Sequence, residues 1–333
     1  QHIIAANEGN AIAIAAGYFM AKRKVPVVYM QNSGLGNTIN PLISLAGSEV
    51  YSIPMILMIG WRGEPGIRDE PQHQKQGSVT EEQLKILDID YYIMDSDTNI
   101  EELVENVSLA INRKSSPVAI LVKKNSFSSY KPKKLQNKTN AITREKAIDQ
   151  IVSLSADDDI LISTTGKSSR ELYEIRGKKS DVQKDFLTVG SMGHASSIAL
   201  GVSIVKRDRK IICLDGDGAL LMHMGALPII GSISPSNFLH IILNNFSHES
   251  VGGQATVASI MDFQKLSEAS NYKNYRKAKN IKELDRAWHK INYLDGPSML
   301  EIIIESSSRE DLGRPTSSPI KNKESFMQFL KNV

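Results

Sequence analysis

Short, continuous apolar runs constrain the fold of this chain more than any other feature of its sequence. The strand-like runs are Val25–Met30, Pro54–Ile59, Pro117–Val122, Asp159–Ser163, Lys210–Leu214, Phe238–Leu243 and Pro297–Ile304. Strands that are apolar along most of their length are buried on both faces, which is typical of parallel sheets. Segments with apolar residues at helical spacing lie between the runs. The sequence therefore predicts an α/β chain in which helices cover both faces of parallel sheets.

Helices and loops are expected between these strands. The expected helices are Glu8–Ala21, Asn37–Ala46, Glu81–Leu87, Ile100–Asn112, one beginning near Thr143, Ser168–Arg176, Ala195–Val205 and Met222–Ile230. Trp61–Gly77 is polar and broken by glycine and proline, so we expect it to be a loop. Lys123–Asn140 is rich in Lys, Ser and Asn and has no periodic apolar face. It indicates a linker, 126–142, between domains at 1–125 and 143–333.

Composition excludes several classes of protein. A length of 333 residues suits about two domains. The net charge is only +3 and no basic patch carries interleaved aromatic residues, so nucleic-acid binding is not expected. No stretch of about 18 apolar residues is present, which argues against a membrane span. Cys213 is the single cysteine, which favours a cytoplasmic location. The chain begins at Gln1 without a signal-peptide pattern, and we expect its first domain to be truncated at the N-terminus.

The strongest local signal is Gly216-Asp217-Gly218, followed 25 residues later by Asn244-Asn245. Each motif comes directly after a buried strand. Because parallel strands end at the same edge of a sheet, we expect both motifs at the edge where open α/β sheets bind ligands. A helix is expected directly after Asp217, with its N-terminus facing the same crevice.

The chemistry of these side chains suits a metal ion and a diphosphate. Mg²⁺ prefers about six oxygen ligands, and Asp217, Asn245 and a main-chain carbonyl near Ser247 can supply three. We expect Gly216 and Gly218 to let the main chain approach a phosphate without an intervening Cβ. The alternative is a surface turn and an ordinary loop, but two strand ends at this spacing favour the metal site.

The motif pair resembles the fingerprint of the thiamine-diphosphate enzyme superfamily. The segment "NEGNAIAIAAGYFMAKRKVPVVYMQNSGLGNTINPLISLAGSEVYSIPMILMIG" is similar to the pyrimidine-binding domain of that superfamily. Further motifs resemble the phosphonopyruvate decarboxylase family, with sulfopyruvate decarboxylases the nearest alternative: "GWRGEPGIRDEPQHQKQG", "GSMGHAS", "GDGALLMHMGAL", "NNFSHESVGGQ" and "DLGRPT". The resemblance implies two doubly wound parallel-sheet domains of thiamine-diphosphate-binding type, a pyrimidine and a diphosphate domain, without a central domain.

The resemblance also implies roles for individual residues. Glu8 corresponds to the glutamate that hydrogen-bonds the cofactor's aminopyrimidine and helps to generate the thiazolium ylide; the alternative is a helix N-terminal residue that complements the helix dipole. Met192 corresponds to the apolar residue that holds the cofactor in a bent form, unless it is only a core methionine. Thr165, Gly166 and Lys167, together with Gly216 to Ala219, are expected to contact the diphosphate. An ordinary N-cap turn is the alternative for the first three.

The substrate implied by the resemblance is a small, acidic 2-oxo acid. Its anionic tail needs cations or amide donors. The candidates are Arg62, Arg68, His73 and Lys75, although a mixed-charge loop is often only a solvated surface. His248 directly follows the Asn-Asn pair, and we expect it to face the reacting carbon. His223 lies on the helix expected after Asp217, and an ordinary helix histidine is as good an interpretation.

The implied reaction is decarboxylation of phosphonopyruvate to phosphonoacetaldehyde and CO₂, with thiamine diphosphate and Mg²⁺ as cofactors, in phosphonate biosynthesis. Sulfopyruvate, or a different 2-oxo acid, is the alternative substrate. A nicotinamide-binding dehydrogenase is disfavoured, because Ile39 occupies the third glycine position after Gly34-Leu35-Gly36. A non-catalytic module would be expected to lack Glu8 or Asp217, and an acetolactate-synthase-like enzyme needs a longer chain. The superfamily resemblance implies a homo-oligomer with the cofactor at the subunit interface.

Overall fold

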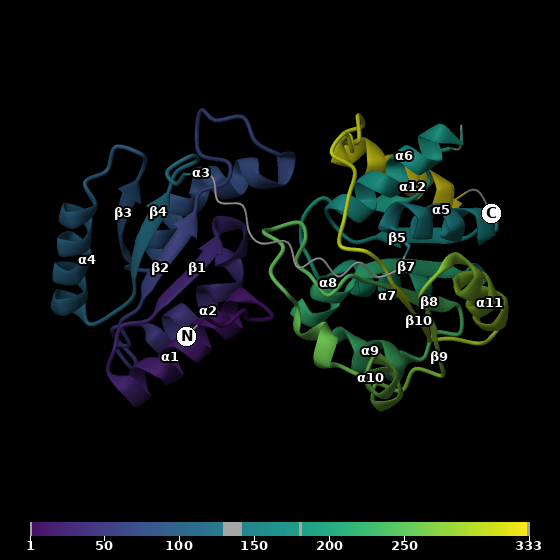
Figure 1. The fold of residues 1–333 in the computed structure, drawn as a ribbon, viewed down its shortest axis with the longest axis horizontal. Coiled ribbons are helices and arrows are strands. Elements are labelled where there is room, and N and C mark those ends of the chain that lie inside the picture. The colour runs from purple at the N-terminus through teal and green to yellow at the C-terminus, as the bar shows by residue number, and fades with distance from the viewer. Residues whose placement is uncertain (1, 129–141, 180–181, 332–333) are drawn as a thin grey trace. The chain divides into compact units, whose positions relative to one another are not determined.

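The chain divides into two compact units, residues 1–134 and 135–333. The computed structural model describes residues 2–128, 142–179 and 182–331 (Figure 1). Most of the predicted linker, 126–142, lies outside the described residues. Among the described residues, no helix has the length and apolar character needed to cross a membrane.

The first unit is built on a parallel sheet. Its strands are β1 (Val27–Gln31), β2 (Ile56–Gly60), β3 (Asp90–Met94) and β4 (Val118–Val122), in the order β1-β2-β4-β3. Its α-helices are α1 (Glu8–Lys22), α2 (Ile39–Pro41), α3 (Pro71–Ile86) and α4 (Ile100–Lys114). Each neighbouring pair of strands is parallel. The predicted α/β architecture is confirmed for this unit.

Alternating side chains of the central strands pack against helices on opposite faces of this sheet. Leu57 and Leu121 belong to a cluster that includes Ile12 of α1 and Leu84 of α3. Residues such as Ile120 point the other way, into a cluster formed with α4. Burial on both faces is the reason that β2 and β4 form continuous apolar runs in the sequence.

Three expectations for the first unit differ from the structure. Trp61–Gly77 is not all loop, because α3 begins at Pro71. Proline is tolerated in the first helical turn, since the N–H groups there have no hydrogen-bond partner within the helix. The segment Asn37–Ala46 is an irregular helix that passes from 3₁₀ through α to π geometry. Strand β3 lies at the sheet edge and carries no continuous apolar run, so it was missed.

The second unit contains a larger parallel sheet in the order β6-β5-β7-β8-β10-β9. Its strands are β5 (Ile160–Ser163), β6 (Phe186–Leu187), β7 (Ile211–Gly216), β8 (Phe238–Asn244), β9 (Asn274–Ala278) and β10 (Ser298–Ile303). Its α-helices are α5 (Arg144–Leu154), α6 (Lys167–Lys178), α7 (Ala195–Ser203), α8 (Asp217–Met222), α9 (Ala226–Ile233), α10 (Phe263–Ala269), α11 (Ile281–Ile291) and α12 (Pro319–Lys331).

Helices cover both faces of this sheet as well. Residues of α5, α6 and α11 pack on one face, and residues of α7, α9 and α10 pack on the other (Figure 1). The chain passes from β5 outward to β6 and then returns past β5 to β7 and β8. The strand order therefore reverses between β5 and β7, and such a switch point is where open α/β sheets bind ligands.

Two expectations for the second unit are corrected. The helix expected at Met222–Ile230 is two helices, α8 and α9, because α8 begins at Asp217 and a turn at 223–225 separates them. With only six residues, α8 supplies a weaker dipole than the sequence analysis assumed. Strands β6 and β9 and helices α10, α11 and α12 were not expected, and both missed strands are again edge strands.

Candidate functional site

The carboxyl ends of β5, β7 and β8 bring the predicted diphosphate residues of the second unit to one edge of its sheet. β5 is followed by Thr165 and Gly166, β7 runs directly into Asp217, and β8 is followed by Asn245. The strands are hydrogen-bonded neighbours, with Gly216 paired to Leu243 at the end of the β7–β8 ladder. The sequence spacing of the two motifs thus corresponds to adjacent positions at the switch point.

Asp217 is a buried carboxylate that forms no ion pair with any described residue. Asp217 is only 2% exposed. Its Oδ2 accepts a hydrogen bond from the Thr256 hydroxyl over 2.5 Å. The main-chain N–H groups of Asn245 and Gly218 also donate to it. Burial nevertheless raises the pKa of Asp217 to about 6, and the hydrogen bonds from Thr256, Asn245 and Gly218 oppose this only in part. A carboxylate in this setting fits a site for a metal cation.

The two asparagines after β8 have different environments. Asn244 is fully buried, and its amide donates to Glu301 over 2.8 Å, so it ties β8 to β10. Asn245 is half-buried at the sheet edge; its Oδ1 accepts from the Ser247 N–H over 3.0 Å, and its Nδ2 donates to Glu249 over 3.0 Å. Only Asn245 therefore presents an amide oxygen at the edge that contains Asp217.

His248 lies in a short antiparallel loop that folds back over the end of β7. Its N–H donates to Gln254 O over 2.8 Å, and the Thr256 N–H donates to Phe246 O over 3.0 Å. A Cβ added to Gly218 would lie 2.8 Å from Nδ1 of His248. The space on the Cβ side of Gly218 is therefore filled by this imidazole. At Gly216, by contrast, an added Cβ would meet no protein atom within 4 Å.

The turn between β5 and α6 is shaped for close approach by a ligand. Gly166 has φ +90° and ψ −135°, a conformation available to glycine and strained for other residues. The hydroxyl of Thr164, which is 5% exposed, is buried with no hydrogen-bond partner among the described residues. Thr165 is half-buried beside it, whereas the ammonium group of Lys167 is paired with Glu249 at 2.9 Å.

Met192 is held in the loop between β6 and α7, beside α8. It stands between two residues with left-handed conformations, Ser191 at φ 51° and Gly193 at φ +87°. A Cβ on Gly193 would lie 2.8 Å from the carbonyl oxygen of Ala219, so this loop packs directly on α8. The rings of His194 and His223 are also in contact there, with centroids 4.2 Å apart.

Glu8 is fixed in the first unit by the loop that follows β1. It is the first residue of α1, which is capped by Asn7, and its Oε2 accepts a hydrogen bond from Asn37 Nδ2 over 2.8 Å. A Cβ at Gly34 would lie 2.1 Å from Oε1 of Glu8, so only glycine leaves room for this carboxylate. Glu8 is therefore oriented toward the loop after β1.

The comparisons with known proteins agree with this geometry. The family described as "Thiamine pyrophosphate enzyme, N-terminal TPP binding domain" matches residues 1–86, and the corresponding "C-terminal TPP binding domain" matches residues 164–302. Phosphonopyruvate decarboxylases from Streptomyces viridochromogenes and Streptomyces hygroscopicus are each 30% identical over 99% of this chain, and the matches cover 85% and 84% of those proteins. A sulfopyruvate decarboxylase from Methanosarcina acetivorans is 28% identical over 93% of this chain and 83% of its own length.

The chain belongs to the thiamine-diphosphate-dependent decarboxylase family. Its two units are the two cofactor-binding domains of that family, and thiamine diphosphate is its cofactor. The α/β fold with two parallel sheets, expected from the sequence, is confirmed.

In this decarboxylase the four predicted substrate residues are not equivalent. Arg62 forms a two-pronged ion pair with Asp69, at 2.8 and 2.5 Å, and this pair holds the pKa of the Asp69 carboxyl well below its usual range. Burial, followed by the charge of Arg62, lowers the pKa of His73, whose buried Nδ1 has no hydrogen-bond partner among the described residues. Arg68 and Lys75 are exposed, and neither side chain forms a hydrogen bond or ion pair with a described residue.

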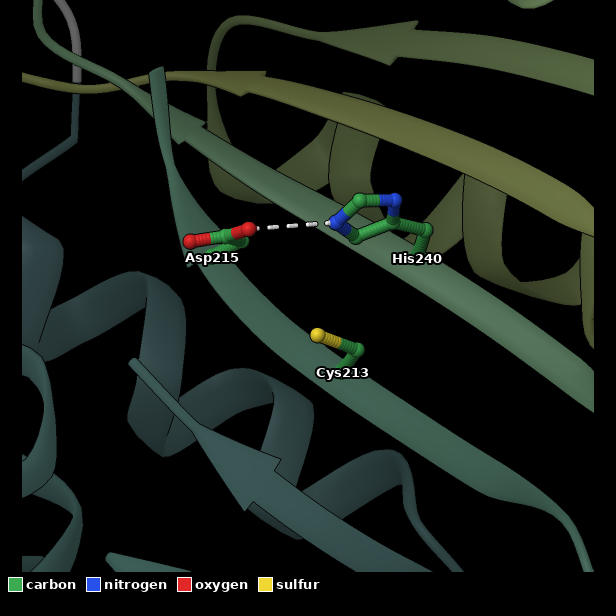
Figure 2. A group of neighbouring side chains, drawn as sticks. All are labelled: Cys213, Asp215 and His240. Carbon is green, nitrogen blue, oxygen red and sulfur yellow. Dashed lines mark hydrogen bonds and ion pairs between the residues drawn. The ribbon is translucent and has the colours of Figure 1, made fainter. Parts of the chain in front are cut away.

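A buried polar cluster is formed by side chains of the neighbouring strands β7 and β8 (Figure 2). Cys213, Asp215 and His240 are completely buried, and their ligand atoms lie within 4.8 Å of one another. Both imidazole nitrogens have partners, because Nε2 faces Asp215 at 3.4 Å and Nδ1 faces the Tyr272 hydroxyl at 3.1 Å. Asp215 Oδ1 also accepts the Gly216 N–H over 2.9 Å. The network is thus hydrogen-bonded internally and supports the turn that carries Asp217.

Sequence reasoning missed four residues at these sites: Asn37, Thr164, Thr256 and Asp215. Asn37 and Asp215 adjoin motifs that had been identified, so their proximity was a usable signal. Thr256 follows the Gly252-Gly253 turn of the loop after β8, and only the folded loop brings it beside Asp217.

Proposed function

We propose that this enzyme decarboxylates 3-phosphonopyruvate to phosphonoacetaldehyde and CO₂, with thiamine diphosphate and Mg²⁺ bound at the sites described above. The phosphonopyruvate decarboxylases that resemble this chain over nearly its whole length support the substrate. The observation that carries the proposal is the buried, uncompensated Asp217 beside Asn245 at the switch point of the second sheet. Sulfopyruvate is the second candidate substrate, because a sulfopyruvate decarboxylase matches 93% of the chain.

The residues at this edge fit a diphosphate and its metal ion. Asp217, the Oδ1 of Asn245 and the carbonyl of Ser247 offer hard oxygen ligands for Mg²⁺. The free N–H groups at the start of α6 and the unpaired hydroxyl of Thr164 offer donors to phosphate oxygens. A cation would compensate the buried charge of Asp217, so the donor set and the metal are complementary.

Thiamine diphosphate, when bound, supplies a nucleophilic carbon and takes up the electron pair that CO₂ leaves behind. Glu8 would hold a proton at the pyrimidine ring through Oε1, the oxygen that does not accept from Asn37. Gly34 and Asn37 orient that carboxylate, and so act as positioning residues.

His248 is the proposed proton donor to the substrate carbon from which CO₂ departs. Burial lowers the pKa of His248, which makes its protonated form a stronger acid. Its contact with Gly218 fixes the ring beside the metal-binding turn.

The phosphonate tail would be bound by cations that are not already paired. Arg68 and Lys75 meet this condition and Arg62 does not, because Asp69 neutralises it. The buried Nδ1 of His73 is a further hydrogen-bonding group in the same segment. We assign Arg62 to holding the loop in shape and the other three to the substrate.

The enzyme is proposed to act in the cytoplasm as a homo-oligomer, with the cofactor at the subunit interface. The homo-oligomer is supported by the resemblance to the superfamily, and the cytoplasmic location by the single cysteine. A preparation that stays monomeric and fully active at every dilution would contradict the proposed homo-oligomer.

Turnover of phosphonopyruvate, sulfopyruvate and pyruvate should be compared side by side, with Mg²⁺ and thiamine diphosphate, by measuring CO₂ release and the aldehyde product. We expect phosphonopyruvate to have the highest kcat/KM. Rapid turnover of sulfopyruvate without turnover of phosphonopyruvate would exclude the first candidate and support the second.

A further inference from the structure

Glu249 joins three elements at the carboxyl edge of the second sheet. Its Oε2 accepts from Arg144 Nη1 at 2.7 Å and from Asn245 Nδ2 at 3.0 Å, and its Oε1 pairs with Lys167 Nζ at 2.9 Å. These partners belong to α5, to the loop after β8 and to α6. Sequence analysis gave Glu249 no role, and the proposed chemistry does not use it.

The carboxylate of Glu249 is rigidly held and ionised. Arg144 is 5% exposed and also forms a two-pronged ion pair with Glu171, at 2.8 and 2.9 Å, so its guanidinium has a fixed position. Two cations lie against this carboxylate, Arg144 at 2.7 Å and Lys167 at 2.9 Å, so it is held as an anion. The hydrogen bond from Asn245 is therefore a charge-assisted bond to a fixed anion.

This bond determines which way the Asn245 amide faces. An asparagine side chain has an oxygen that accepts and an NH₂ group that donates, and it can be rotated to exchange the two. An anionic acceptor tolerates only the NH₂ group, so Glu249 holds Nδ2 on its own side and leaves Oδ1 on the other. The Ser247 N–H, which donates to Oδ1, selects the same orientation and leaves the oxygen a second lone pair.

The same geometry explains the position of the Lys167 ammonium group. Its ammonium group compensates Glu249 rather than standing alone at the start of α6. A second carboxylate beside a metal site would otherwise compete with Asn245 for the cation, and the pairing with Lys167 and Arg144 removes that competition.

We propose that Glu249 is a positioning residue that fixes the amide orientation of Asn245 so that its oxygen binds the divalent metal. The inference rests on the proposed function, in which Asn245 is a metal ligand. Metal ligands are commonly oriented by hydrogen-bond partners of this kind, whose loss weakens metal binding by about 10- to 100-fold.

The test is a titration of the enzyme with Mn²⁺ in the presence of saturating thiamine diphosphate and without substrate. Binding is measured from the EPR signal of the Mn²⁺ that remains free. Glu249→Gln can present either an oxygen or an NH₂ group to Asn245, so only the weaker bond from the Ser247 N–H is left to select the orientation. We expect its Mn²⁺ affinity to fall by about tenfold. Glu145→Gln is the matched control, because Glu145 also bridges two cations, Lys178 and Arg309, in the same unit. It should bind Mn²⁺ as the wild type does.

The same substitution in an Asn245→Asp variant separates an effect on the amide orientation of Asn245 from general structural damage. In Asn245→Asp both side-chain oxygens are ligands, so there is no orientation to select, and Glu249→Gln should cause no loss of Mn²⁺ affinity there. An unchanged affinity for Glu249→Gln alone, or an equal loss in both backgrounds, would overturn the inference. If the wild type itself binds no Mn²⁺ with thiamine diphosphate, the proposed function fails instead, and the two failures are thus distinguished.

Discussion

The Thr256 hydroxyl donates a hydrogen bond to Oδ2 of Asp217 over 2.5 Å, although 39 residues separate the two along the chain. Both residues are buried, and Thr256 is the one side chain among the described residues that donates to this carboxylate. The loop after β8 thus returns to the Gly216–Gly218 segment twice, through His248 against Gly218 and through Thr256 against Asp217.

Thr256→Val removes that hydroxyl while preserving the shape of the side chain. We expect Mn²⁺ affinity, measured with thiamine diphosphate present, to fall by about 10-fold or more, since Asp217 loses the partner that orients it. Ser267→Ala is the control, because it removes a buried hydroxyl that donates to a helical carbonyl away from the site. Equal metal affinity in the two variants would contradict the role of Thr256.

Asp217 is expected to destabilise the cofactor-free enzyme at alkaline pH. Its pKa of about 6 lies above its ordinary value of 3.8, so the folded state binds more protons than the unfolded state, and stability falls as pH rises through this interval. The difference of about two units corresponds to about 3 kcal/mol. In EDTA at pH 8, Asp217→Asn should therefore have a higher free energy of unfolding than the wild type.

Chemical denaturation at several pH values measures this effect. The stability gap between Asp217→Asn and the wild type should narrow as pH falls toward 4. A variant that is less stable than the wild type at pH 8 without metal would show that the carboxylate is not strained by burial.

Gly34 and Gly36 offer a matched pair of tests for the orientation of Glu8. A Cβ at Gly34 would lie 2.1 Å from Oε1 of Glu8, whereas a Cβ at Gly36 would meet nothing within 4 Å. Gly34→Ala must therefore displace the carboxylate, and we expect kcat to fall by about 100-fold, at the lower end of the effect of a lost general acid–base group. Gly36→Ala should retain its kcat, and a comparable loss in both variants would point to the loop rather than to Glu8.

Glu8→Gln tests the carboxylate itself against the alternative that it only complements the helix dipole. Its kcat is expected to fall by about 10² to 10⁴-fold. Glu101→Gln alters a glutamate in the first turn of α4, also after an asparagine cap, and should cost only about 0.3–1 kcal/mol of stability. If Glu8→Gln behaved like Glu101→Gln, Glu8 would have no part in catalysis.

Cys213 should be unreactive in the folded enzyme. Burial, with a smaller contribution from the charge of Asp215, raises the pKa of its thiol well above the ordinary value, and the thiolate is the reactive form. A thiol reagent at pH 8 should label the native protein only at the rate at which it unfolds. Rapid labelling of the native state would show that the cluster in Figure 2 is open to solvent.

The central strands could be predicted from the sequence because burial on both faces leaves a continuous apolar run, as in β4, β7 and β8. The missed strands, β3, β6 and β9, all lie at sheet edges. An edge strand has a neighbouring strand on one side only, so polar residues such as Asp90 and Lys277 are accommodated there. The sequence pattern therefore located the switch point and its motifs but not the borders of the sheets.

The partners of the site residues were harder to predict, because they depend on how loops fold back. Nothing in the spacing of Arg62 and Asp69 shows that they neutralise each other, or that Lys167 is paired with Glu249. Charge and position indicated these cations as ligand-binding groups, and only the coordinates separate the paired ones from Arg68 and Lys75.

The central claim is that Asp217 and Asn245 bind the diphosphate of the cofactor through a divalent metal. The most direct measurement is calorimetric titration of the metal-free enzyme with thiamine diphosphate, in Mg²⁺ and in EDTA, for the wild type and Asp217→Asn. The account predicts tight binding by the wild type in Mg²⁺ only, and weak, Mg²⁺-independent binding by the variant. Equal affinity of the wild type in Mg²⁺ and in EDTA would contradict it.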